Sequence, residues 1–206
     1  MLEPLIDKIQ KQIGDKPIEL LWFGDNFKMT VGEKRTTMLN IAKGKYINWI
    51  DDDDDVVDDY VSCILAALET NPDAVTFESI FSNAGNNTER HLYYERRNTN
   101  FNKADGTRYR MLNHITPVKR SHALKIGGFP HANYGEDGNY AIKLFNGHEG
   151  MRLLNNVVNI PKVLYLYKFD PEVSRTDKYS PRHNPAAMAM AQRIDQHEHA
   201  PDGRVI

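Results

Sequence analysis

Apolar residues recur along the chain at two different spacings, which separate expected helices from expected strands. Spacings of three and four residues predict helices over Leu2–Ile13, Val31–Lys43, Val57–Leu68, Arg120–Ile126 and Glu136–Phe145. Short runs rich in β-branched and aromatic residues predict strands over Ile18–Phe23, Lys45–Ile50, Ala74–Phe77, Asn113–Val118, Leu153–Val158 and Val163–Phe169. This alternation is typical of an α/β domain in which helices flank a sheet.

The sequence becomes polar from Asp170 onward. We therefore expect a single domain over residues 1–169, which is long enough to bury a core of its own. Residues 170–206 are expected to form a polar C-terminal extension, with one helix at Pro185–Ile194.

The most unusual stretch is a run of five aspartates, Asp51 to Asp55, between an apolar strand and a helix. Ligands of open α/β sheets bind at the carboxyl ends of strands, where this run lies. Alternate residues of an extended chain face the same way, so Asp51 and Asp53 can address one ligand together. Such an oxygen pair suits Mg²⁺ or Mn²⁺ bound with a phosphorylated substrate, although a solvated acidic loop or adventitious Ca²⁺ binding explains it too.

The last acids of this region are expected to start a helix. Asp55 is in the position of an N-cap, with Asp58 three residues later as the acid of a capping box. Asp58 and Asp59 also lie in the first turn, where negative charge complements the helix dipole.

Two further charged features face the expected sheet. Arg35 falls on the inward stripe of its helix, so it needs an anionic partner, which is either one of the aspartates or a phosphate. A second acidic motif, Glu136-Asp137, begins the helix that ends at Phe145. Helical spacing places Asp137 on the inward stripe with Ala141 and Leu144, where it either caps the helix or acts as a general base.

Composition excludes several classes of protein. A net charge of −2 argues against a strongly basic nucleic-acid-binding surface, and a single cysteine rules out an intramolecular disulfide. No apolar run reaches membrane-spanning length and no signal-peptide pattern begins the chain. A cytoplasmic location is the default expectation.

Two motifs carry a resemblance to a known family. The first is the stretch Gly32–Asp53, with Arg35 on a helix that leads through Ala42–Ile47 into the aspartates. The second is Gly127-Gly128-Phe129, followed by Gly135-Glu136-Asp137. Their order and separation resemble the glycosyltransferases of family 2, which have the GT-A fold, a Rossmann-like mixed sheet flanked by helices. The resemblance covers about Ile18 to Leu144.

The resemblance implies transfer of a sugar from a nucleotide-diphosphate donor to an acceptor hydroxyl, with inversion and with Mn²⁺ or Mg²⁺. By position, Asp51 would lie near the donor's ribose, Asp53 would ligate the metal together with Asp51, and Asp137 would be the catalytic base. The implied substrate-binding residues, which include the base-contacting acid and the donor-phosphate arginine, are Asp25, Arg35, Asp51, Asp52 and Glu136. Family members begin with a strand that precedes the first helix of this chain, so we expect an N-terminally shortened domain.

Two other functions remain open. The missing strand makes a catalytically impaired transferase-like domain plausible, one that binds a nucleotide sugar or a partner. Asp53-Asp54-Asp55-Val56-Val57 also nearly fits the motif of haloacid-dehalogenase-type phosphatases, a lower alternative because two more aspartates precede it in place of a buried strand.

The acceptor is not defined by the sequence. His91–Arg97 and Thr107–Leu112 are expected to form the two arms of a ribbon that mixes aromatic residues with arginines. The family's acceptors include polysaccharide, lipid-linked glycan and protein, with viral DNA bases less probable. A solvated hairpin edge is the favoured interpretation of the ribbon.

Overall fold

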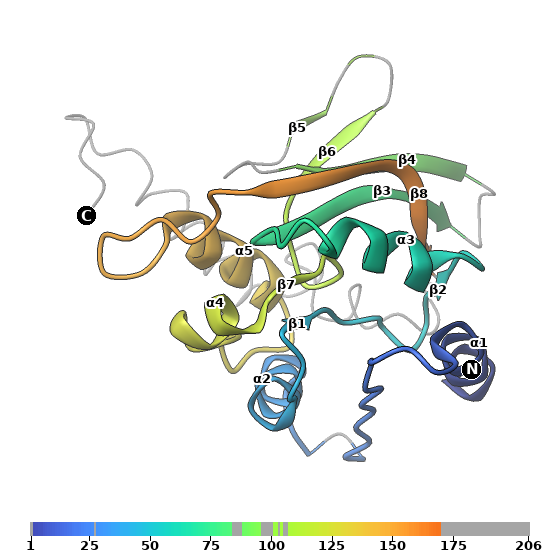
Figure 1. Cartoon of the computed structure of the whole chain (residues 1–206), viewed down its shortest axis with the longest axis horizontal. Coiled ribbons are helices and arrows are strands. Elements are labelled where there is room, and N and C mark those ends of the chain that lie inside the picture. Colours follow the sequence, from blue (N-terminus) through green and yellow to red (C-terminus); the bar gives the residue numbers. More distant parts are fainter. Residues whose placement is uncertain are drawn as a thin grey trace, which may run out of the picture. The chain divides into compact units, whose positions relative to one another are not determined.

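The computed structural model describes residues 2–26, 28–83, 88–95, 101–102, 104 and 107–169 (Figure 1). Five helices and eight strands lie in this part of the chain. The helices are α1 (Leu2–Ile13), α2 (Val31–Ile41), α3 (Tyr60–Leu68), α4 (Arg120–Lys125) and α5 (Glu136–Asn146). The strands are β1 (Tyr46–Ile47), β2 (Asp55–Val56), β3 (Ala74–Asn83), β4 (Thr88–Glu95), β5 (Phe101–Asn102), β6 (Arg108–Met111), β7 (Val118–Lys119) and β8 (Val157–Phe169).

All eight strands belong to one mixed sheet with β3 at its centre. β8 runs parallel to β3 along one edge, while β7 and then β4 pair antiparallel with the other edge. The order continues from β7 to β1 in one direction and from β4 through β6 to β5 in the other. The expected α/β fold with helices flanking a mixed sheet is therefore confirmed.

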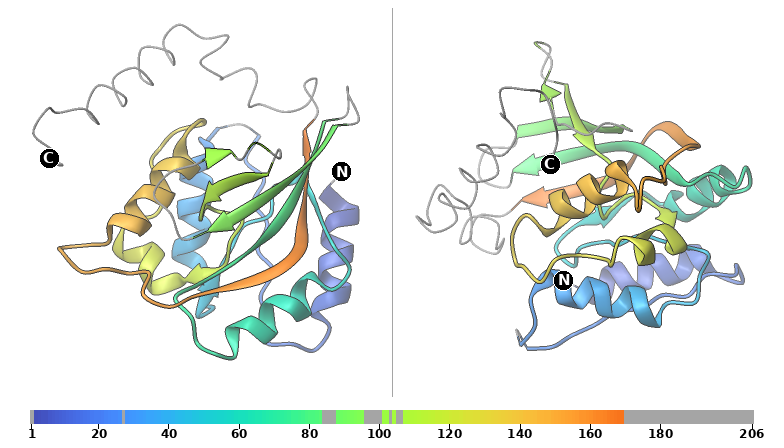
Figure 2. Two further views of the ribbon diagram at one scale, coloured as in Figure 1. Left: turned by 90° about the horizontal axis from the view of Figure 1, so that it is seen from above. Right: turned by 90° about the vertical axis from the view of Figure 1, so that its left-hand side faces the viewer.

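The helices form two groups on the two sides of β8 (Figure 2), and each group encloses a hydrophobic core. Residues of α1 and α3 pack with Phe77 and Leu164 in one core. Residues of α2, α4 and α5 pack with Trp49 and Ala74 in the other. Ala74 and Phe77 lie three residues apart on β3, so their side chains leave opposite faces of the sheet.

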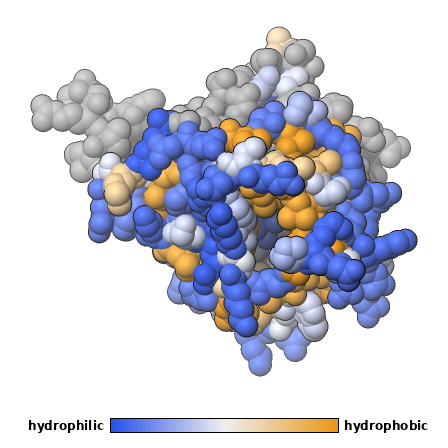
Figure 3. All heavy atoms as spheres, in the orientation of Figure 1, coloured by the Kyte–Doolittle hydropathy of each residue, from blue (hydrophilic) through white to orange (hydrophobic). Residues whose placement is uncertain are grey.

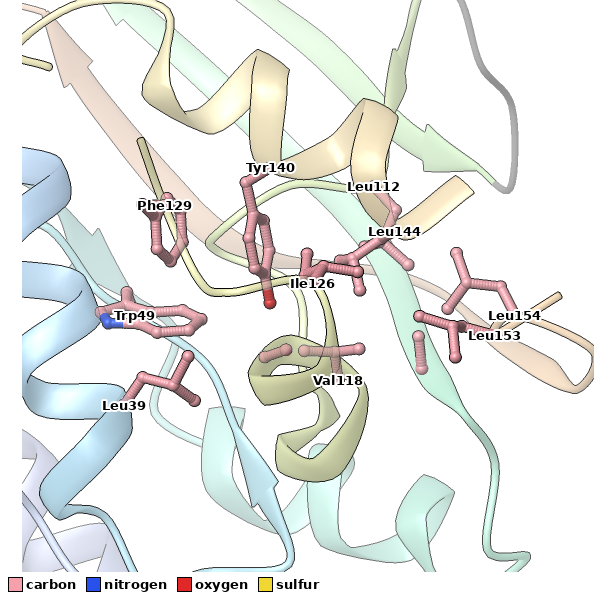
Figure 4. Packing of buried hydrophobic residues seen from close by; sticks show 12 residues of the cluster. Leu39, Trp49, Leu112, Val118, Ile126, Phe129, Tyr140, Leu144, Leu153 and Leu154 are labelled. Atoms are coloured by element: carbon pink, nitrogen blue, oxygen red, sulfur yellow. The ribbon is translucent and has the colours of Figure 1, made fainter. Parts of the chain in front are cut away.

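The second core is organised around three aromatic rings, which Figure 4 shows in contact. The ring of Phe129 stacks on that of Tyr140 with 4.1 Å between centroids. The indole of Trp49 meets both rings edge-on, at 4.9 Å from Phe129 and 5.8 Å from Tyr140. Edge-to-face and offset pairs are the favourable arrangements of aromatic rings, so this cluster fixes the segment between β1 and the aspartates against α5.

The strand expected at Ile18–Phe23 does not form. This segment pairs with no strand of the described sheet, in which β1 has β7 as its only neighbour. Ile18 and Leu20 pack on the first core, whereas Trp22 remains 66% exposed. The expectation of a mostly buried strand is therefore wrong, since Leu21 and Phe23 are exposed as well. A ladder needs a partner strand that the sequence pattern does not reveal.

Two expectations about β pairing are also corrected. The arms of the ribbon, β4 and β6, pair parallel rather than as an antiparallel hairpin, because β4 already pairs antiparallel with β3 and β5 reverses the chain onto β6. The two strands expected on either side of Pro161 form the single strand β8. Its register against β3 jumps from the Phe77–Ile160 pair to the Glu78–Val163 pair, so the proline lies in a bulge.

The helix after the aspartates begins later than expected. Asp55 belongs to β2, which pairs antiparallel with β8, and the N-cap of α3 is Asp59, which makes no side-chain capping bond. The Asp55 carboxylate instead binds Lys8 at 3.1 Å and Lys168 at 3.0 Å. Pairing with β8 therefore overrides the capping pattern.

The described residues end at Phe169, the last residue of β8. The helix expected at Pro185–Ile194 lies outside the described residues. Among the helices of the described part, none is long and apolar enough to cross a membrane. Hydrophobic side chains do reach the surface of the face drawn in Figure 3.

Candidate functional site

The aspartate loop is anchored from both sides of the sheet. Ahead of it, the Trp49 N–H donates to the His114 carbonyl at 3.1 Å. The Asp51 N–H donates to the Tyr165 hydroxyl at 3.1 Å, and that hydroxyl donates to Asp54 at 2.6 Å. Tyr165 is fully buried on β8, so one tyrosine fixes both ends of the loop's first turn.

Arg35 joins the two acidic motifs inside the molecule. Its Nη2 lies 2.6 Å from Asp51 Oδ1 and its Nη1 lies 2.7 Å from Glu136 Oε1, and its side chain is only 7% exposed. The guanidinium also lies 5.6 Å from the centroid of the Phe129 ring. The expected salt bridge between Arg35 and an aspartate is therefore present.

Local packing explains why α2 presents Arg35 at this point. Thr30 and Glu33 form a capping box at the start of the helix, as their side chains bond each other's backbone N–H groups. A Cβ atom at Gly32 would lie 1.8 Å from the Pro130 carbonyl oxygen, so only glycine lets α2 lie this close to the following turn. The Gly32 N–H donates to the Ala132 carbonyl at 3.0 Å.

A second contact clamps the same two segments. The Thr36 hydroxyl accepts a hydrogen bond from the Phe129 N–H at 2.9 Å, and it lies 3.3 Å from the Phe129 carbonyl oxygen. Gly128 adopts φ +69°, where a side chain would be strained and would also strike Thr36. The Gly127-Gly128-Phe129 motif thus places α2 against the turn that leads to α5.

Helix α5 brings its two acids to different surroundings. Glu136 shares the buried face with Tyr140, Ala141 and Leu144, whereas the Asp137 side chain is 40% exposed. The expectation that Asp137 lies on the inward stripe is therefore wrong, since the Arg35 guanidinium draws Glu136 inward instead. Asp137 accepts a hydrogen bond from the Gly138 N–H at 2.8 Å and remains open to solvent.

His114 lies between the two acidic motifs. Its Nε2 is 3.0 Å from Asp51 Oδ2, and its Nδ1 is 3.9 Å from Asp137 Oδ2. The side chain is 7% exposed. With Arg35 on one carboxylate oxygen and His114 on the other, Asp51 is bound by protein groups on both of its oxygens.

The charges of this cluster determine the ionisation of its buried acids. Burial opposes ionisation of Asp51, but the neighbouring Arg35 and His114 side chains hold the pKa of its carboxyl far below the ordinary value. Burial likewise disfavours the Arg35 charge, yet Asp51 and Glu136 raise the pKa of the guanidinium. Asp51 and Arg35 therefore form an ion pair in the interior.

For two other acids of the loop, Asp53 and Asp54, the surroundings raise the pKa instead of lowering it. Burial, followed by the charge of Asp51, raises the pKa of Asp53. The same two causes raise the pKa of Asp54 to about 8, against the hydrogen bonds that it receives from Tyr165 and Lys168. Within the described residues, no basic side chain forms an ion pair with Asp53 or Asp54. Among the buried and half-buried acids of the loop, Asp51 and Asp55 are paired with basic side chains of the described residues, whereas Asp53 is not.

The fit to a divalent cation follows from these contacts. No three His, Cys, Asp or Glu side chains of the described residues converge on a common point as a protein-only metal site. Asp53 is half-buried and has no cationic partner there, and the Asp51 oxygens keep further lone pairs beside it. These donors suit Mg²⁺ or Mn²⁺, which proteins often hold by one or two carboxylates while substrate phosphates and water complete the shell.

Two of the expected substrate-binding residues, Asp52 and Asp25, take no part in the ion pairs among Arg35, Asp51, His114 and Glu136. Asp52 is exposed at the tip of the loop. The Asp25 carboxylate lies 3.4 Å from the Lys34 ammonium and accepts a hydrogen bond from the Met29 N–H at 2.6 Å. These contacts shape the approach to α2, and no described contact joins Asp25 to the aspartate loop.

Sequence reasoning missed two residues of the site. His114 and Tyr165 lie in stretches that were expected to be plain strands. The available signal was weak in both cases: a histidine within the apolar run Asn113–Val118, and a tyrosine whose hydroxyl needs a partner when buried.

Comparison with known proteins places this geometry in a family. The profile described as Glycosyl transferase family 2 matches residues 2–125. A comparison with curated protein sequences gave no match. The chain belongs to glycosyl transferase family 2. The matched residues include the Gly32–Asp53 motif and end before the Gly127–Asp137 motif.

Solved structures of S. aureus TarS have a similar fold. TarS 1-349 in complex with UDP-GlcNAc matches with a TM-score of 0.53 and 13% identity, over 80% of this chain and 46% of that one. TarS 1-349 in complex with UDP matches with a TM-score of 0.50 and 16% identity, over 73% and 42% of the two chains. This chain therefore spans less than half the length of these TarS structures, and at such identities the likeness establishes the GT-A fold alone.

Proposed function

We propose that this domain transfers a sugar from a nucleotide-diphosphate donor to an acceptor hydroxyl. The observation that carries the proposal is the cluster of Arg35, Asp51, His114 and Glu136, which holds the aspartate loop against the start of α5. Within this cluster, His114 lies between Asp51 and the half-exposed carboxylate of Asp137, which is 3.9 Å from its Nδ1. Family membership supports glycosyl transfer rather than the phosphatase alternative.

The donor would bind at the aspartate loop. Asp53, with Asp51 beside it, would hold Mg²⁺ or Mn²⁺, and such an ion when bound offsets negative charge on a leaving diphosphate. Asp51 has its orientation fixed by Arg35 and His114, so it is prepared to receive the donor's ribose. Because both terminal nitrogens of Arg35 bind carboxylates, we propose that this arginine serves donor binding chiefly through Asp51.

The acceptor would be activated by Asp137. This carboxylate takes the proton of the acceptor hydroxyl while the hydroxyl oxygen attacks the anomeric carbon of the sugar. The bond from that carbon to the diphosphate oxygen breaks, and the diphosphate leaves with the bonding electron pair. A single displacement of this kind inverts the anomeric configuration. The 40% exposure of the Asp137 side chain allows an acceptor to reach it.

Donor binding tests the proposal directly. Because two TarS structures hold UDP and UDP-GlcNAc, calorimetric titration begins with UDP-GlcNAc and continues through other UDP- and GDP-sugars, each with Mn²⁺ or with chelator. We expect metal-dependent binding that Asp53→Ala weakens at least about tenfold, since one charge contact to a bound ion is lost. The matched control is Asp58→Ala, because Asp58 follows the same acidic run and its side chain is 97% exposed.

The possible results separate the parts of the proposal. Equal binding by Asp53→Ala in the presence of chelator would exclude the metal assignment. Failure of the wild type to bind any nucleotide sugar of the panel would contradict the transferase itself. Binding without any release of nucleotide diphosphate would favour the alternative of an impaired, ligand-binding domain.

A further inference from the structure

The buried imidazole of His114 is the feature of the site that the proposed chemistry leaves unexplained. Its Nε2 contacts Asp51 Oδ2 at 3.0 Å, while its Nδ1 is buried and has no hydrogen-bond partner among the described residues. The Asp137 Oδ2 atom lies 3.9 Å from that nitrogen. One ring therefore lies between the donor-side acid and the candidate base.

The ring is held in a rigid turn. The Asn113 carbonyl accepts hydrogen bonds from the N–H and the hydroxyl of Thr116, at 3.2 Å and 2.6 Å. Ile115 and Thr116 are buried, and the His114 carbonyl accepts the Trp49 N–H. The backbone on both sides of the ring is thus fixed, so a change at the ring does not require the turn to move.

The contact with Asp51 defines which part of the ring is free. Asp51 is ionised and can only accept, so the hydrogen of His114 that faces it is on Nε2. The remaining ring nitrogen points to α5. A buried polar atom is normally paired, and a shift of about 1 Å by the half-exposed Asp137 side chain would bring it within hydrogen-bond distance. The Asp137 carboxylate can only accept, so in that bond Nδ1–H is the donor.

We propose that His114 is a positioning residue that ties the orientation of Asp137 to the aspartate loop. Through Nε2 the ring is fixed by the donor-side acid, and through Nδ1 it sets where the base carboxylate lies. This inference rests on the proposed function. It assigns to His114 an effect on the rate of transfer that is separate from its effect on donor binding.

Two substitutions separate the two ring nitrogens. In His114→Gln the amide reaches the position of Nε2 and keeps the contact with Asp51, but the Nδ1 side is lost. In His114→Asn the amide occupies the position of Nδ1 and the contact with Asp51 is lost. The probe is UDP release from UDP-GlcNAc with water as the acceptor, measured as kcat and as KM for the donor.

We expect His114→Gln to lower kcat about tenfold or more with the donor KM within about threefold, because misplacing a base by about 1 Å is costly to the rate but not to donor binding. His114→Asn should raise the donor KM. An unchanged kcat in His114→Gln would overturn the proposal. The proposal would also be overturned if His114→Gln and His114→Asn changed kcat by the same factor and the donor KM by the same factor. Such a result would indicate a structural role alone.

The chain offers a matched control in His122. The side chain of this histidine is 15% exposed and its Nε2 lies 3.2 Å from Asp73 Oδ1. Its Nδ1 is buried and, like that of His114, has no hydrogen-bond partner among the described residues. It contacts none of the site residues described above. His122→Gln therefore reports the cost of the same change outside the site, and we expect its kcat to match that of the wild type.

A measurement on the ring itself does not depend on activity or on the folding of a histidine variant. We expect Asp137→Asn to shift the ¹⁵N resonance of His114 Nδ1 in the otherwise intact chain and to leave the His122 signals in place. Unshifted His114 signals would overturn the proposal. If the wild type releases no UDP from any donor, the proposed function fails, whereas this spectrum still tests the link between His114 and Asp137.

Discussion

Arg35 on α2 and Glu136 on α5 lie 101 residues apart in the sequence and share a buried charged hydrogen bond of 2.7 Å. The same guanidinium binds Asp51 at the end of the strand before the aspartates. Three segments that carry the two sequence motifs are thus joined by one side chain. Such a buried ion pair contributes positioning more reliably than net stability, because desolvation opposes the attraction of the charges.

Removal of Arg35 should therefore be costly. Arg35→Ala leaves Asp51 and Glu136 without a cationic partner on that side, and breaking a buried ion pair in this way costs about 3–5 kcal/mol. We expect a loss of that order in the free energy of unfolding, measured by urea denaturation. Asn40→Ala, an exposed position on the same helix, is the control and should change the value by less than about 0.5 kcal/mol. A loss below about 1 kcal/mol for Arg35→Ala would show that water replaces the guanidinium.

The close approach at Gly32 gives a second prediction, on packing. Gly32→Ala places a methyl group within 1.8 Å of the Pro130 carbonyl oxygen, so α2 must move away from the turn. We expect destabilisation of about 1–3 kcal/mol, as for other overpacked sites. Gly138→Ala is the matched control, since nothing lies within 4 Å of the new atom and alanine favours the helix. A thermal melt that ranks the two variants in the opposite order would contradict this packing.

The raised pKa of Asp54 predicts how the free energy of unfolding depends on pH. Burial, followed by the charge of Asp51, raises the pKa of the folded carboxyl to about 8, against 3.8 as its ordinary value. Between these values the folded state holds a proton that the unfolded state has lost, so the free energy of unfolding falls as the pH rises through this window. The stabilising contribution of the protonated Asp54 carboxyl is complete below about pH 4 and is lost above about pH 8.

Denaturation at pH 5.5 and at pH 9 tests this dependence. Asp54→Asn removes the titrating group while keeping its size, so we expect the variant to lose less stability than the wild type between the two pH values. Asp52→Asn, an exposed neighbour, serves as the control. An equal loss in the wild type and in Asp54→Asn would assign the dependence to another group.

Asp73 is a structural acid outside the site. It accepts hydrogen bonds from the Asn155 and Asn156 N–H groups, both at 2.9 Å, and binds Lys119 at 2.8 Å. Asp73→Asn loses the charge that these groups share, and we expect a loss of about 2–4 kcal/mol in the free energy of unfolding. UDP release per folded molecule should be unchanged. A fall in that rate would extend the functional site to the start of β3.

The helices could be predicted from the sequence because their signal is local. α1 begins and ends where apolar spacing places it, and α5 starts at Glu136 as predicted. Strand pairing depends instead on which distant segments meet. The apolar pattern of Ile18–Phe23 therefore did not reveal that this segment lacks a partner strand, and only Ile18 and Leu20 pack on the first core. The Asp55 capping pattern likewise did not reveal the competing strand β8.

The site residues also divide into those with a local signal in the sequence and those placed by contacts between distant segments. Arg35 and the aspartates could be selected from the sequence, because a charge on an inward stripe and a run of acids are visible without a structure. Which acid of the Glu136-Asp137 pair turns inward depends on where Arg35 lies, and that is fixed by the packing of Gly32 against the turn at Pro130. The local turn around His114 does not reveal its partners, because Asp51 and Asp137 come from segments distant in the sequence.

The role of Asp137 is tested most directly by steady-state UDP release from UDP-GlcNAc by the wild type and Asp137→Asn, with donor affinity measured in parallel by calorimetry. Asparagine keeps the acceptor for the Gly138 N–H but cannot take a proton. We predict a donor affinity within about threefold of the wild type and a kcat lower by about 100-fold or more, as expected for loss of a general base. A kcat equal to that of the wild type, at equal donor affinity, would contradict Asp137 as the base.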